Sequence, residues 1–146
     1  MDVKTYWEKF TNEFPEYKNK AYTSWAFGVD SDHLVQLVKD GTKTATTSAL
    51  TMYRLDDEPM PETGDVSIIL ESNDEPVCII ENIAVYQKPF KEIDEDFAFK
   101  EGEGDRSLSY WRQAHIAFFE PYYADYDISF NEDEIMVCEE FKCIYQ

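Results

Sequence analysis

The sequence predicts a mixed α+β domain, because helical and strand patterns of hydrophobic residues both recur along one chain of 146 residues. Residues 3–14 and residues 108–122 place apolar side chains at helical spacing. Three further runs have the length and the β-branched or aromatic content of strands, namely residues 66–72, 76–87 and 134–145. A hydrophobic share of 43% and an aromatic share of 16% are sufficient for one large core.

The N-terminal segment is expected to form an aromatic-faced helix. Its apolar residues follow the pattern i, i+3, i+4, i+7 and i+11, as Val3, Tyr6, Trp7, Phe10 and Phe14. Asp2 can begin this helix and Pro15 must end it. We therefore expect one domain over residues 1–146, in which residues 1–22 are an N-terminal helical extension packed on the body.

A second helix is expected to end at Gly41, with Asp30 or Ser31 as its N-cap. Lys43 then opens the segment KTATTSAL, in which several hydroxyls follow a lysine at a helix-to-strand turn. In a regular strand the side chains alternate between two faces. That alternation places Thr44, Thr46 and Ser48 on one face, and Lys43, Ala45 and Thr47 on the other.

The remaining segments follow in order. Residues 22–28 are short, aromatic and irregular, and residues 52–65 are expected to form a loop because they contain two prolines and a glycine. The strands at 66–72 and 76–87 then form an antiparallel pair. A short helix is expected to end at the glycines of KEGEGD, and a longer one to begin at Ser107 and close at Pro121.

Composition restricts the partners. The net charge of −18, from 13 basic and 31 acidic residues, would repel long duplex nucleic acid or long RNA. A nucleoside, a short single strand of RNA in a locally basic cleft, or a basic protein partner remains compatible. Three cysteines at spacings typical of neither metal nor redox sites, and no apolar run long enough to span a membrane, favour a reduced cytoplasmic protein. No metal and no cofactor is predicted.

Two clusters could carry chemistry. The loop EGEGD holds Glu101, Glu103 and Asp105, which could face a ligand, bind a hard cation or form a solvated surface. The hydroxyls after Lys43 could supply a nucleophile, although threonine also favours strands for packing reasons alone. His33, in the first turn of the second helix, is interpreted as a surface residue.

Five segments in this order resemble the ASCH domain family: WAFG (25–28), GTKTATTS (41–48), PETGD (61–65), FAFKEGEGD (97–105) and SYWRQAHIAFF (109–119). The resemblance extends from about Trp25 to the C-terminus. It implies a PUA-like mixed or antiparallel β-barrel with helices packed around it, a cleft beside the G-x-K-T segment, and a role in binding RNA or its components. Small bacterial members include an N4-acetylcytidine amidohydrolase, and a ribonuclease activity has been attributed to others.

By this resemblance the catalytic residues would be Lys43, Thr46 and Glu101, with Glu103 as an alternative glutamate. Thr46 would attack the acetamide carbonyl, Lys43 would take its proton or stabilise the oxyanion, and Glu101 would relay protons. Substrate-binding residues are expected to include Trp25, Phe27, Thr44, Arg54, Glu103, Asp105 and Arg106. A non-catalytic PUA-like module that binds RNA or a nucleotide, or a ribonuclease, is the alternative.

The enzymatic interpretation sets three conditions. Lys43, Thr46 and a carboxylate of Glu101 or Glu103 must converge around one pocket. Lys43 can act as a base only if its pKa is lowered, which the acidic chain opposes unless burial or a nearby cation such as Arg54 or Arg106 dominates. Lys43 and Thr46 can meet only if the strand bends, bulges or begins after Lys43.

Overall fold

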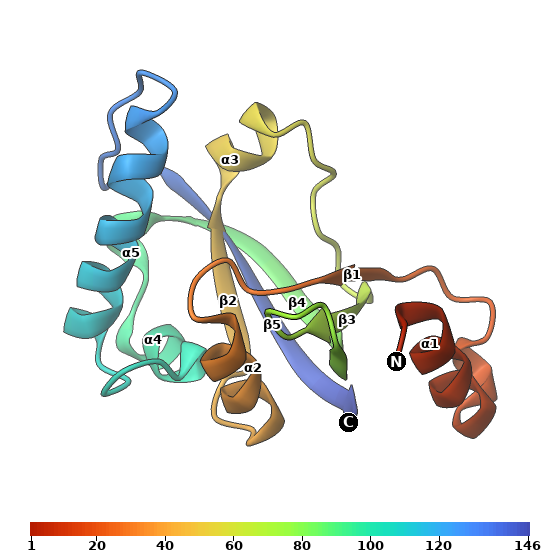
Figure 1. Ribbon diagram of the computed structural model, residues 1–146. Helices are drawn as coiled ribbons and strands as arrows, with labels where there is room; N and C mark the ends of the chain where they lie inside the picture. The colour runs from red at the N-terminus through yellow and green to blue at the C-terminus, as the bar shows by residue number, and fades with distance from the viewer.

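The computed structural model describes residues 1–146 and confirms an α+β fold built on one curled sheet (Figure 1). The sheet has five strands in the order β1-β3-β4-β5-β2. β1 pairs with β3 in parallel and every other pair is antiparallel. The strands are β1 (Thr23–Trp25), β2 (Ala45–Ala49), β3 (Val66–Leu70), β4 (Pro76–Pro89) and β5 (Ile135–Tyr145).

Two long strands give the sheet its curvature. β4 and β5 span 14 and 11 residues and pair along most of their length, with register shifts between Ile79 and Ile80 and between Asn82 and Ala84. Such bulges increase local twist, so the sheet curls into a half-barrel. The barrel does not close by strand pairing, because β1 pairs only with β3 and β2 only with β5. This leaves a seam between the two edge strands.

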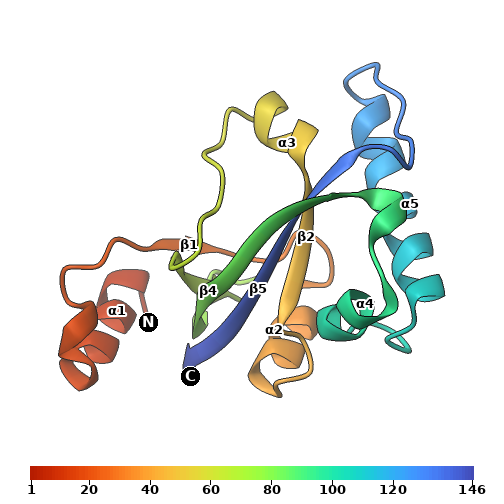
Figure 2. The ribbon, with the colours of Figure 1, turned by 180° about the vertical axis from the view of Figure 1, so that it is seen from behind.

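The N-terminal helix α1 (Val3–Glu13) packs on the sheet at the end far from α5 (Figure 2). It begins as predicted, with the Asp2 side chain accepting a hydrogen bond from the Thr5 backbone N–H at 2.7 Å. A single-turn helix, η1 (Pro15–Tyr17), follows it. One core cluster joins α1 to β3 and β4. Its members are Tyr6, Trp7, Phe10, Val66, Ile68, Leu70 and Ile79.

The other helices pack around the opposite part of the half-barrel. They are α2 (Ser31–Lys39), α3 (Leu50–Leu55), the single turn η2 (Phe90–Glu92), α4 (Glu95–Glu101) and α5 (Leu108–Ala124). Asp94 and Ser107 cap α4 and α5 through side-chain hydrogen bonds to Phe97 N–H and Tyr110 N–H. The largest core cluster lies between these two helices and the sheet, and it includes Phe90, Phe97, Trp111, Phe119 and Tyr123.

Three expectations about local structure were wrong. Residues 23–25 form a strand, because parallel pairing with β3 supplies backbone partners that an irregular segment would lack. Residues 50–55 form α3, which overlaps the end of the expected KTATTSAL strand and the start of the loop expected over residues 52–65. α5 continues past Pro121 to Ala124, since Tyr123 is fully buried in the core and its packing outweighs the hydrogen bond that proline removes.

None of the helices combines the length and the hydropathy needed to cross a lipid bilayer.

Candidate functional site

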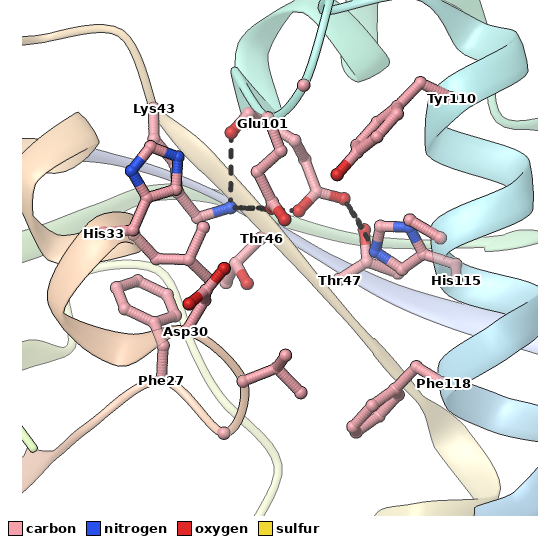
Figure 3. Close-up of a pocket in the computed structure, with 16 residues that line it drawn as sticks. Phe27, Asp30, His33, Lys43, Thr46, Thr47, Glu101, Tyr110, His115 and Phe118 are labelled. Carbon is pink, nitrogen blue, oxygen red and sulfur yellow. Dashed lines mark hydrogen bonds and ion pairs between the residues drawn. The ribbon is translucent and has the colours of Figure 1, made fainter.

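A pocket of about 250 Å³ opens where β2, the start of α2 and the α4–α5 connection meet (Figure 3). Phe27 lines one side, and Tyr110 and Phe118 line the side formed by α5. Two threonines of β2, Thr46 and Thr47, contribute hydroxyls to its lining. The ionisable side chains that line it are Asp30, His33, Lys43, Glu101, Glu103 and His115. The pocket is thus aromatic on two sides and charged at its base.

Lys43 is the central charge of the pocket, although it is only 1% exposed. Its Nζ donates to Glu103 Oε2 at 2.9 Å, to Glu101 Oε1 at 3.1 Å and to the Ala45 carbonyl at 2.9 Å. The backbone holds it there, because the Lys43 N–H donates to the Leu37 carbonyl at the end of α2. A buried ammonium with this set of acceptors is paired and hydrogen-bonded on every side.

Glu101 lies at the C-terminal end of α4 and is also 1% exposed. Its Oε1 accepts from Lys43, and its Oε2 accepts from Thr47 Oγ1 at 2.7 Å and from the indole N–H of Trp111. His115 Nε2 lies 3.3 Å from the same Oε2. Both carboxylate oxygens are thus engaged by neighbouring donors, so Glu101 holds the charged cluster together.

His115 completes the cluster and was missed as a site residue, because its place on the apolar face of α5 predicts only core packing. Its Nδ1 lies 2.8 Å from the Trp111 carbonyl, and its ring stacks on the Trp111 indole with centroids 4.1 Å apart. Both ring nitrogens therefore face acceptors, a carbonyl and a carboxylate, which favours the doubly protonated imidazolium. No signal in the sequence pairs this histidine with Glu101.

The ionisation of the cluster follows from these contacts. Burial alone would lower the pKa of Lys43, but Glu101 and Glu103 outweigh it and raise the pKa above its usual value. Burial would raise the pKa of Glu101, but Lys43 and His115 hold it well below the usual range. The pKa of His115 is raised because Glu101 outweighs its burial. Lys43 is thus an ammonium in the resting site, which argues against a role as the base.

The acid stability of the protein is expected to depend on Glu101. Its folded pKa is lowered, so the unfolded chain, with a glutamate pKa of about 4.3, takes up the proton first as pH falls. The contribution of Glu101 to the free energy of unfolding is therefore complete above about pH 4.3 and is lost as pH falls towards the pKa of Glu101 in the folded protein. Urea unfolding measured from neutral to acidic pH should show a flatter profile for Glu101→Gln than for the wild type. Parallel profiles would contradict this.

Two glycines let the EGEGD loop reach the pocket. Gly102 has a φ of +75° and caps α4, and a Cβ there would collide with the Thr42 carbonyl. Gly104 has a φ of +59°, and a Cβ there would lie 2.6 Å from the Tyr110 ring. The loop therefore lies directly against the approach to β2 and beneath the Tyr110 ring.

We expect Gly102→Ala to lower the free energy of unfolding by about 1–3 kcal/mol, because it adds left-handed strain to a backbone collision. Gly28→Ala is the matched control, since a Cβ at Gly28 meets nothing within 4 Å and its φ is unremarkable. Urea unfolding compares the two variants. Equal stabilities would show that the loop can move aside.

Five of the predicted site residues meet at the pocket: Phe27, Lys43, Thr46, Glu101 and Glu103. The strand condition is met because β2 begins at Ala45, after Lys43.

The three threonines of this segment have different surroundings. Thr47 lies on the same face as Lys43 and Ala45, as alternation predicts, and its hydroxyl donates to Glu101. The Thr44 hydroxyl donates to the Lys100 carbonyl at 3.4 Å, outside the pocket. The Thr46 hydroxyl makes no comparable bond and is free for a ligand.

The other predicted residues lie elsewhere. Arg54 is exposed on α3 and lines neither this pocket nor its neighbour. Asp105 accepts a hydrogen bond from the Ser107 N–H at 2.9 Å, next to the start of α5. Arg106 stacks on the Phe99 ring, 3.5 Å from its centroid, and donates to the Phe99 and Thr42 carbonyls. Asp105 and Arg106 therefore shape the loop and do not line the pocket.

A larger groove of about 850 Å³ joins the pocket along the seam between β1 and β2. The two cavities share Phe27, Gly28, Thr46, Thr47 and Phe118. Trp25 lies in this groove, with Tyr53, and four carboxylates line it, those of Glu58, Glu62, Asp65 and Glu139. Its charge would repel phosphate groups.

No three His, Cys, Asp or Glu side chains are grouped in a way that could hold a metal ion. The charged side chains of the pocket bind one another instead.

The fold and the pocket define a class: a small curled half-barrel with a charged pocket beside its edge strand. A family model described as the ASCH domain matches residues 23–145. The chain therefore belongs to the ASCH domain family.

Solved structures agree with this assignment. An ASCH domain from Lactobacillus crispatus is 30% identical, with a TM-score of 0.91 over 98% of this chain and 94% of that one. A protein from Enterococcus faecalis is 32% identical, with a TM-score of 0.86 over 98% of this chain and 88% of that one. A hypothetical protein at 14% identity, covering 85% of this chain and 100% of its own, shares the fold alone at a TM-score of 0.56. A search of curated proteins found no significant match.

Proposed function

We propose that the pocket binds a modified nucleoside and hydrolyses an amide on it, with N4-acetylcytidine as the example. The observation that supports this most directly is the free Thr46 hydroxyl in the same pocket as the buried Lys43 ammonium. The aromatic rings of Phe27, Tyr110 and Phe118 suit a planar base. The pocket and the adjoining groove together are large enough for a nucleoside, because ligand sites measure about 300–1,000 Å³.

The charge and the exposure of each side chain suggest its role in the proposed hydrolysis. Thr46 Oγ attacks the acetyl carbonyl carbon, and its proton passes to the carboxylate of Glu103, whose side chain is 25% exposed. Once Glu103 has taken this proton it no longer attracts the Lys43 ammonium as a carboxylate does, so the N–H that was bonded to Glu103 turns to the oxyanion and stabilises it. When the C–N bond breaks, the proton on Glu103 moves to the departing amino nitrogen of cytidine. Water then hydrolyses the acetyl-threonine ester and releases acetate. Glu101 holds Lys43 in place and does not carry protons.

The test is release of cytidine and acetate from N4-acetylcytidine, compared among the wild type, Thr46→Val and Thr44→Val. Thr46→Val should reduce kcat by about 10³-fold or more, because the nucleophile is lost. Thr44→Val is the matched control, since its hydroxyl contacts Lys100 outside the pocket. Absence of turnover in the wild type would exclude the hydrolase, whereas equal turnover in Thr46→Val would exclude only its nucleophile.

A second candidate function is binding of a short single strand of RNA without chemistry. The groove that continues from the pocket favours it, because Trp25 and Tyr53 could stack on successive bases. The four carboxylates along the groove weigh against it. Binding of short oligonucleotides should be measured against salt, since the phosphate contribution is greatest at low ionic strength. Undetectable binding under those conditions would exclude this function.

A further inference from the structure

Along the unpaired edge of β2, the backbone N–H and C=O groups of alternate residues point away from the sheet. β2 pairs only with β5, in the register Ala45↔Glu140, Thr46↔Glu139 and Thr47↔Cys138. The Phe141 N–H donates to the Thr44 carbonyl at 2.9 Å, so Thr44 and Phe141 stand at a hydrogen-bonded position of the ladder, although the Thr44 N–H leaves it for the Lys100 carbonyl. Because the two kinds of pair alternate in an antiparallel ladder, Thr46 also bonds to β5. The N–H and C=O of Ala45 and Thr47 therefore point outward.

A direct contact confirms this direction. The Ala45 carbonyl accepts from Lys43 Nζ at 2.9 Å, on the side of β2 away from β5. The next outward residue is Thr47, which lines both the pocket and the groove. Its backbone N–H and C=O make no hydrogen bond outside the ladder, to backbone or to side chains. A donor and an acceptor on one residue are thus left open at the junction of the two cavities.

We propose that the backbone of Thr47 recognises the ligand, its N–H donating to a ring acceptor and its C=O accepting from a neighbouring N–H. This proposal takes its nucleoside ligand from the proposed function but does not require hydrolysis. The ligand class is a planar molecule with an acceptor and a donor side by side on one edge. Cytosine fits this description, through N3 and the N4 amino group.

The alternative ligands fit the open edge less well. A phosphodiester has no donor to offer the Thr47 carbonyl, and the carboxylates of the groove repel any phosphate. A sugar hydroxyl can donate or accept but lacks the flat faces that the surrounding rings of Phe27 and Phe118 would contact. Backbone groups at this position must find a partner or water, so a ligand that satisfies both displaces solvent without leaving either group unpaired.

Amide hydrogen exchange measured by NMR tests the geometry in the free protein. The Thr46 and Ser48 amides bond to β5 and should exchange slowly, whereas the Thr47 amide should exchange about tenfold faster or more. The neighbouring amides are internal controls, because all three lie on one strand. Equal protection of the three amides would overturn the proposal.

The same measurement with saturating cytidine tests recognition. Cytidine should slow exchange of the Thr47 amide by about tenfold or more, and ribose should leave it unchanged. N4,N4-dimethylcytidine, which lacks the donor, should bind about fivefold more weakly, the effect of one hydrogen bond. Absence of cytidine binding, or binding without slower Thr47 exchange, would overturn the proposal. Protection by cytidine without acetyl release would overturn only the hydrolase.

Discussion

Lys43→Met is expected to lower the free energy of unfolding by about 3–5 kcal/mol, because it removes one partner of a buried ion pair. Glu101 would keep its hydrogen bonds from Thr47 and Trp111 but would lose the ammonium at 3.1 Å. His115 would then be the one cation left beside this buried carboxylate, so the charge of Glu101 would be only partly compensated. Urea unfolding of the variant and the wild type at neutral pH measures the difference.

Two variants make this result specific. Lys43→Met combined with Glu101→Gln should recover much of the loss, since a neutral amide no longer needs the cation. Lys100→Met removes an exposed pair with Glu140 and should cost less than about 1 kcal/mol. If Lys43→Met is as stable as Lys100→Met, then Lys43 and Glu101 do not form the compensated buried pair described above.

Phe10→Ala should also destabilise the protein by about 3–5 kcal/mol, the cost of deleting a buried aromatic side chain. Phe10 is 1% exposed, and its ring contacts those of Trp7, Phe14, Tyr17 and Tyr145. Tyr145 belongs to β5, so α1 and the sheet share these contacts. Loss of stability in the whole domain would show that residues 1–22 fold as part of it.

Ile83→Ala is the control for this experiment. Ile83 lies in β4 but is 52% exposed, so its truncation leaves no cavity and should change stability by less than about 0.5 kcal/mol. Unfolding should be followed by tryptophan fluorescence and by circular dichroism. If the two signals no longer coincide in Phe10→Ala, α1 detaches separately and is an appended element.

The sequence could predict what depends on local spacing. The periodic apolar face of α1, its start at Asp2, and the antiparallel pair of β3 and β4 all follow from patterns of a few residues. β1 and α3 were missed because their partners are distant: Trp25 pairs with Ile69, and the short α3 has no apolar period of its own. Tertiary contacts decide such segments.

The segment from Leu34 to Ser48 by itself determined that a lysine and several hydroxyls lie at a helix-to-strand turn. Only the tertiary structure decided which groups meet there. It buried Glu101 against Lys43, brought His115 across from α5, and left Thr46 free while Thr47 bonds to Glu101. The physical reason is that pKa, burial and hydrogen-bond partners depend on contacts between separate elements, such as those of Lys43 and Thr47 with glutamates 54 to 60 residues away in sequence.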